Sequence, residues 1–156
     1  MLEHINSLYT VYTRLVVYDR QGCIVAASRP TCQDGSSVLG TWVEPATLAA
    51  VLALPSTQSY HVTPWGPSPL DDGKSTCVYH AAIRAPDNDG SVLGGIGVVF
   101  NASGEFAAML HGAVAGKPNT VTVFVVRHGE ILASTDPARP VGQRVGDMRL
   151  DLAEAG

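Results

Sequence analysis

The chain contains the same short pattern twice, and this repeat constrains its fold more than any other feature. Residues 15–28 read LVVYDRQGCIVAAS, and residues 123–135 read VFVVRHGEILAST. Each copy has an apolar run, a charged turn that contains glycine, a second apolar run and a hydroxyl residue near its end. Two apolar runs joined by a tight glycine turn predict a β-hairpin. Because an isolated hairpin is barely stable in water, each copy must pack on further structure.

The rest of the chain supplies helices and further strands. Residues 2–13 place Leu2, Ile5, Tyr9 and Tyr12 at helical spacing, which predicts a leading amphipathic helix. The stretch 41–44 (TWVE) has the spacing of a capping box, and the apolar face after it predicts a second helix that ends before Pro55. Strands are expected at 59–63, 76–84 and 91–100, and Ser103 is expected to cap a third helix. This order predicts an α+β domain with a central antiparallel sheet of about five strands flanked by helices.

The composition excludes several classes of protein. The 156 residues are 46% apolar and 15% charged, which favours a folded core over disorder. A formal charge of -4 without a basic stripe argues against nucleic-acid binding. No apolar run approaches the roughly 18 residues of a membrane span, and the first residues lack the pattern of a signal peptide. The three cysteines show no paired spacing, so we expect neither a disulfide framework nor a zinc knuckle. No metal-binding spacing of histidines and no nucleotide-binding motif is apparent, so we expect no metal and no cofactor.

The order of elements and three motifs resemble those of PAS-like bacterial sensor domains, especially the double-Cache type, with GAF domains as close relatives. The motifs are VVYDRQGCIVAAS as an opening hairpin, VLGGIGVVF at 92–100 as part of a closing hairpin, and VFVVRHGEILASTDPARPVG as the opening of a second module. The two hairpin glycines are about a hundred residues apart, which is the size of one small domain. The resemblance implies that residues 1–113 form one sensor module with its leading helix. Residues 114–156 would then begin a second module or add strands to the same sheet.

Sensor modules of this type hold a small molecule against one face of the sheet, so the resemblance implies a ligand site. The candidates for it are Tyr60, His61, Trp65, Asp71, Asp72, Tyr79, Gly95 and Gly97, with Trp42 and Arg84 as weaker ones. Aromatic side chains combine an apolar body with a polar handle, and the family often holds a ligand's amino group with an aspartate. Glycines inside a strand mark a close approach by a helix, a backbone or a ligand. The chain lacks the complete Tyr-Arg-Trp-Tyr series of amino-acid sensors, which argues against an amino-acid ligand.

Three functions are compatible with these features. The first is a non-catalytic sensory domain of a bacterial signal transduction or chemotaxis protein, whose partners are an unidentified small molecule and a downstream signalling domain of the same chain. The second is an interaction module of the same fold that forms a homodimer through its leading helix. A small enzyme is disfavoured because no nucleophile–base pair is apparent. The unpaired cysteines favour a cytoplasmic location, with the periplasmic or extracellular part of a membrane receptor as the alternative.

Overall fold

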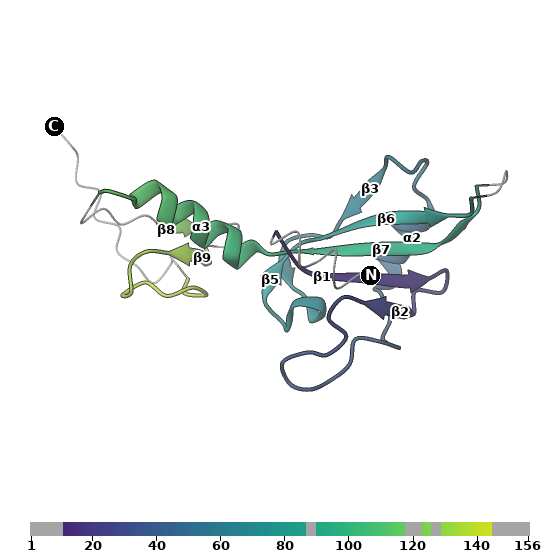
Figure 1. Ribbon diagram of the computed structural model, residues 1–156, viewed down its shortest axis with the longest axis horizontal. Helices are drawn as coiled ribbons and strands as arrows, with labels where there is room; N and C mark the ends of the chain where they lie inside the picture. Colours follow the sequence, from purple (N-terminus) through teal and green to yellow (C-terminus); the bar gives the residue numbers. More distant parts are fainter. Residues whose placement is uncertain (1–10, 87–89, 118–122, 126–128, 145–156) are drawn as a thin grey trace. The chain divides into compact units, whose positions relative to one another are not determined.

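The computed structural model describes residues 11–86, 90–117, 123–125 and 129–144. Its contacts divide the chain into two compact units, Met1–Asn101 and Ala102–Gly156. The first unit holds a large sheet and helix α2, and the second holds helix α3 and a small hairpin (Figure 1). The division therefore falls before α3, whereas the sequence suggested a boundary at residue 113. That residues 114–156 begin a second module stays a prediction.

A five-stranded antiparallel sheet forms the first unit, in the order β2-β1-β7-β6-β3 (Figure 1). Its strands are β1 (Tyr12–Asp19), β2 (Ile24–Ala27), β3 (Tyr60–Val62), β6 (Val78–Arg84) and β7 (Val92–Phe100). The predicted α+β class and the sheet of about five strands are thus confirmed. The predicted leading helix is wrong for Tyr12 and Thr13, which lie in β1. Residues 1–10 lie outside the described residues, and so does the dimer contact expected of them.

The turn between β1 and β2 is built as the sequence predicts. Gly22 has a φ of 96°, a left-handed conformation that other residues rarely adopt. The Asp19 carboxylate accepts hydrogen bonds of 2.9 Å from the backbone N–H groups of both Gln21 and Cys23. This side chain therefore fixes the backbone of the turn and, with it, the pairing of the two strands.

Helix α2 and several loops cover one face of the sheet. The cluster at the centre of this packing joins Val16 and Tyr18 of β1, Ile24 of β2 and Val51 of α2 (Pro45–Leu52), all at most 2% exposed. The loops carry the short elements β4 (Gly66–Pro67), η1 (Pro69–Asp71) and β5 (Ser75–Thr76). Strand alternation therefore separates a covered face from an opposite face that carries the exposed side chain of Tyr79.

The start of α2 differs from the predicted capping box. Helix α2 begins at Pro45, and Glu44 is its N-cap residue without a side-chain capping bond. Thr41, the predicted cap, instead donates its hydroxyl hydrogen bond to the carbonyl of Val38, at 2.6 Å. Pro45 suits the first helical position because it has no N–H to satisfy. The helix thus begins one turn later than the spacing suggested, and the Glu44 carboxylate is left uncommitted.

The second unit packs α3 (Ala102–Val114) against the predicted second hairpin, β8 (Val123–Val125) and β9 (Ile131–Ser134). Leu110 of α3 and Ile131 of β9 are at most 1% exposed. Strands β8 and β9 pair with each other as a separate two-stranded sheet. A helix therefore supplies the apolar surface on which this hairpin packs, as hairpin stability requires.

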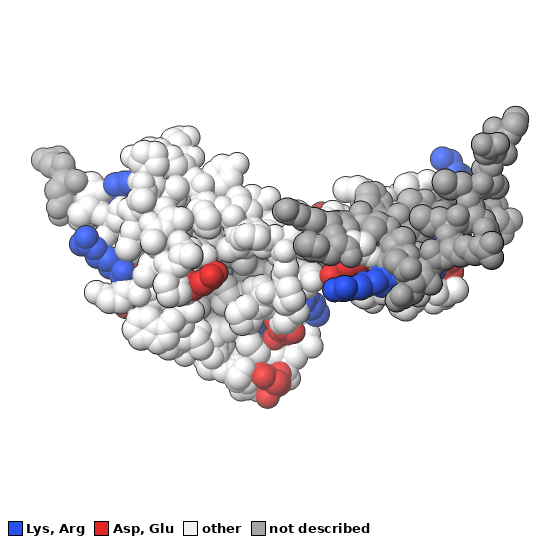
Figure 2. All heavy atoms as spheres, turned by 180° about the vertical axis from the view of Figure 1, so that it is seen from behind, with Lys and Arg blue, Asp and Glu red and all other residues white. Residues whose placement is uncertain are grey.

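Two features of the described residues bear on the class of protein. None of the helices in this part of the chain is both long and apolar enough to cross a membrane. On the face shown in Figure 2, the Lys and Arg side chains are few and do not merge into a basic patch. This face therefore does not provide the electrostatic footprint that binding to nucleic-acid phosphates requires.

Candidate functional site

Two aromatic rings lie at the centre of the covered face of the sheet. Tyr18 of β1 and His80 of β6 are 1% and 2% exposed. Their Oη and Nδ1 atoms share a hydrogen bond of 3.1 Å, and the rings meet edge to face with centroids 5.8 Å apart. Each polar group therefore satisfies the other where water is excluded, as buried polar groups require.

Glycines in the strand between them make room for these rings. Strand β7 lies between β1 and β6, with Gly95 opposite Tyr18 and Gly97 opposite His80. A Cβ on Gly95 would lie 2.3 Å from the Tyr18 hydroxyl oxygen, and a Cβ on Gly97 would lie 3.1 Å from the His80 ring. Only glycine therefore allows the Tyr18 ring to lie across β7. The close approach predicted from the strand glycines is made by side chains of the neighbouring strands.

Burial keeps both rings uncharged. It raises the pKa of Tyr18 far above its usual value of 10.0. Burial and, to a smaller extent, the Coulombic effect of the nearby His61 lower the pKa of His80 to about 4. His80 is consequently neutral at pH 7, with one ring nitrogen donating and the other accepting a hydrogen bond. Since Nδ1 is occupied by Tyr18, Nε2 remains for another partner.

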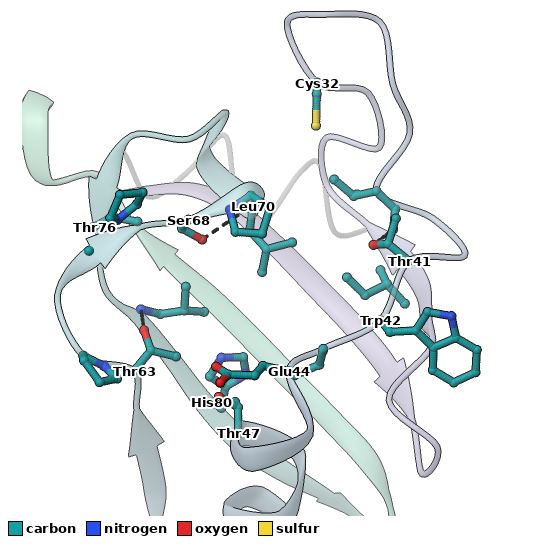
Figure 3. A pocket seen from close by; sticks show the side chains of 18 of the residues that line it. Cys32, Thr41, Trp42, Glu44, Thr47, Thr63, Ser68, Leu70, Thr76 and His80 are labelled. Atoms are coloured by element: carbon teal, nitrogen blue, oxygen red, sulfur yellow. Dashed lines mark hydrogen bonds between the residues drawn. The ribbon is translucent and has the colours of Figure 1, made fainter.

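A cavity of about 610 Å³ lies above this floor, between the sheet, the start of α2 and the loops (Figure 3). His80, Val78 and Ile24 line it from the strands, and residues 41–44 and 63–70 line it from the loops. A volume of this size falls within the range of about 300–1,000 Å³ that is typical of small-molecule sites. Apolar side chains and prolines make up much of the lining, with hydroxyl groups between them.

Most of these hydroxyl groups hold the loops in place. Thr63 accepts a hydrogen bond of 2.9 Å from the backbone of Val78, and Ser68 accepts one of 3.2 Å from Leu70. Thr76 donates to the carbonyl of Phe100 at 2.7 Å. These bonds shape the walls of the cavity and use part of the hydrogen-bonding capacity of the hydroxyl groups that form them.

The polar groups of the lining that have no hydrogen-bond partner within the described part of the chain include the Glu44 carboxylate, the Thr47 hydroxyl and Nε2 of His80. Figure 3 shows all three side chains at the end of the cavity where α2 begins. They offer a negative charge, a hydroxyl and an imidazole nitrogen to whatever fills the space. A few converging polar groups in an apolar cavity are the usual pattern of a small-molecule site.

Some of the predicted site residues lie at or near the cavity, and others lie on the opposite face of the sheet. Trp65 lines the cavity, Gly95 and Gly97 lie under its floor, and His61 neighbours His80 with ring centroids 6.4 Å apart. The opposite face of the sheet carries Tyr60 and Tyr79, whose rings are 6.0 Å apart. Those two tyrosines therefore do not line this cavity.

The predicted acidic residues and Arg84 lie outside the cavity lining, whereas Trp42 belongs to it. Asp71 is 8% exposed in η1, and the Asp72 carboxylate accepts a hydrogen bond of 3.0 Å from Gln33. Arg84 donates to the carbonyls of Gly90 and Leu54 at the far end of β6. Trp42 lines the cavity, but it is 67% exposed and its indole points away from the centre in Figure 3.

Sequence reasoning missed Glu44, Thr47 and His80 as site residues. The signal for His80 was present, because strand alternation places it on the same face as Val78 and Ala82, and the strand glycines suggested a close approach. Glu44 was assigned to a capping box, which gave its carboxylate a partner in its own helix. Thr47 had no signal, since its exposure to the cavity depends on where α2 begins. Among the described residues, no cluster of three or more His, Cys, Asp or Glu side chains could hold a metal ion.

Comparisons with known proteins identify the fold. No protein-family model and no curated protein sequence matches the chain. An extracellular ligand-binding receptor from Desulfohalobium retbaense matches with a TM-score of 0.63 and 18% identity, over 93% of this chain and 25% of that chain. The sensor domain of the histidine kinase DctB from V. cholerae matches with a TM-score of 0.58 and 18% identity, over 88% of this chain and 47% of that chain.

The chain thus spans less than half the length of each of these two structures. At this level of identity the likeness establishes the fold. The chain has the fold of bacterial sensor and ligand-binding domains, and the PAS-like, Cache-like architecture expected from the sequence is confirmed.

Proposed function

We propose that this chain is a non-catalytic sensory domain of a bacterial signal transduction protein, and that its cavity binds a small molecule. The observation that carries this proposal is the cavity of about 610 Å³ whose free polar groups converge at the start of α2. The fold supports it, because two solved structures with this fold are a ligand-binding receptor and a kinase sensor domain. Fold alone does not fix function, so the site carries the argument.

The proposed role has a physical basis in the way the cavity is built. Its floor belongs to the sheet, and one wall belongs to the start of α2 and the loop before it. A ligand that contacts both sides favours the arrangement in which they are close together. Such differential affinity for one arrangement is what shifts a signalling equilibrium, and a downstream domain of the same chain would be the recipient.

Calorimetry and thermal shift against a panel of small metabolites test the proposal. A ligand at a hundred times its Kd should stabilise the first unit by about 2.7 kcal/mol. His80→Asn and Thr47→Val should weaken binding of any ligand found, because each removes a polar group that faces the cavity. Tyr79→Phe is the matched control, since this exposed residue lies on the opposite face of the sheet. Equal loss in the control, or no binding by any metabolite, would contradict ligand sensing.

A further inference from the structure

The described residues of the cavity lining include an acidic side chain but no basic one. Among the described side chains that line the cavity, Glu44 is the one acidic residue, and none is a lysine or an arginine. The imidazole of His80 is neutral because the sheet and α2 bury it. A ligand in this cavity would therefore meet one negative charge and no positive charge from the lining. This charge pattern bears directly on the chemistry of the ligand.

The position of Glu44 indicates that its carboxylate faces the ligand. An N-cap residue commonly accepts hydrogen bonds from the first turn of its helix, but the Glu44 side chain makes no such bond. In Figure 3 the side chain extends from the start of α2 into the cavity, on the side where His80 lies. Its carboxylate has no hydrogen-bond or ion-pair partner within the described residues. It is consequently available to pair with a charge on a bound molecule.

The positive end of the α2 dipole would favour an anion here. Two facts weaken it. Pro45 occupies the first helical position and has no N–H to donate. The Glu44 carboxylate already lies at this end of the helix, where it offsets the partial positive charge. A ligand carboxylate at this position would be repelled by Glu44 and would find no basic side chain in the lining.

We infer that the ligand carries an ammonium or quaternary ammonium group that pairs with Glu44, and that it carries no carboxylate. This inference rests on the proposed function, since it assumes that the cavity binds a ligand. The neutral groups beside Glu44 complete the site: Thr47 offers a hydroxyl, and Nε2 of His80 offers one donor or acceptor. The indole of Trp65, also in the lining, adds an aromatic surface of the kind that attracts organic cations. An organic cation with an apolar body and one further polar group fits this set.

Probes that share one apolar body and differ in charge test the inference. The set is 2-phenylethylamine, phenylalanine, 3-phenylpropionate and 2-phenylethanol, with choline as a second cation, each titrated into the full chain by calorimetry at pH 7.5. The two cations should bind more tightly than the zwitterion, and 3-phenylpropionate should bind least. Glu44→Gln should weaken cation binding at least tenfold and leave 2-phenylethanol unchanged. Glu105→Gln in the second unit makes the same change of charge at a residue that is not part of the cavity lining, and it should alter neither the binding of the cations nor that of 2-phenylethanol.

The outcomes separate this inference from the function on which it rests. Binding of 3-phenylpropionate or phenylalanine in preference to the amine would overturn the cationic ligand and leave ligand sensing intact. Cation binding that Glu44→Gln does not weaken would overturn the pairing with Glu44. If no probe binds at millimolar concentration and no metabolite of any charge does so either, ligand sensing itself fails and the inference fails with it.

Discussion

The substitution Gly95→Ala tests how the floor of the cavity is built. The added Cβ would lie 2.3 Å from Oη, 2.4 Å from Cζ and 2.6 Å from Cε2 of Tyr18. Carbon atoms in van der Waals contact are about 3.5–4.0 Å apart, so the ring must move by about 1 Å or the strands must separate. Because Tyr18 is 1% exposed, the ring has no free space to enter. Overpacking of this kind costs about 1–3 kcal/mol.

Displacing the ring also removes its hydrogen bond to His80, which adds about 0.5–1.5 kcal/mol. We therefore expect Gly95→Ala to lower the free energy of unfolding of the first unit by about 2–4 kcal/mol. Urea unfolding followed by tryptophan fluorescence measures this directly, because both tryptophans of the chain, Trp42 and Trp65, lie in the first unit. The matched control is Gly66→Ala, whose Cβ would meet nothing within 4 Å.

A double-mutant cycle identifies the Tyr18 ring as the cause. Replacing Tyr18 with leucine removes the atoms that the new Cβ would meet, so Gly95→Ala should cost at least 1 kcal/mol less in that background. Two results would refute the reasoning. One is a Gly95→Ala protein within about 0.5 kcal/mol of the wild type, which is the range of ordinary surface substitutions. The other is full additivity of the two substitutions.

Two further predictions concern buried polar groups. Ser28→Ala should destabilise the first unit by about 1–3 kcal/mol, because it leaves the buried N–H of Leu15 without its acceptor at 2.9 Å. Ser37→Ala removes an acceptor from an exposed loop and should cost less in the same unfolding assay; equal costs would contradict the role of burial. Stability should also fall as the pH drops from about 6.5 to 4, because the pKa of His80 is about 4 in the folded chain and near 6.5 when exposed. The unfolded state binds the proton first over this range, and the total loss is about 3 kcal/mol. His80→Asn should flatten this part of the pH profile, and an unchanged slope would show that other groups cause it.

The sequence predicts the architecture because the signals for it are local. Alternation over 91–100 and the turn glycine at Gly22 depend on neighbouring residues only, so they identify strands and hairpins without knowledge of the fold. The prediction of a helix over Tyr12 and Thr13 was wrong for the opposite reason. Pairing of β1 with β7 adds a ladder that helical spacing cannot reveal, and tertiary pairing overrides local preference.

The site was harder to predict because it depends on contacts between distant segments. Tyr18 meets Gly95 and His80 only after three strands have paired in one register, and no local pattern encodes that meeting. Tyr79 was chosen for its aromatic ring, yet adjacent strand residues point to opposite faces of the sheet. His80, which pairs with Gly97, is the residue that lies on the covered face. For Glu44, a shift of the helix start by one turn changes a capping residue into one that faces the cavity.

Hydrogen exchange gives the most direct test that the cavity links α2 to the sheet. The first amides of α2 have no partner in the helix, and no side chain caps them, so this end of the helix is held mainly by packing. A ligand that pairs with Glu44 and also contacts His80 would join the helix start to β6. Local opening of α2 then requires release of the ligand, so a probe at a hundred times its Kd should slow exchange within Pro45–Leu52 by up to about 100-fold. The amides of α3, in the second unit, are the internal control and should keep their rates. Equal slowing in both helices, or slowing confined to the loops, would show that the ligand does not bridge α2 and the sheet.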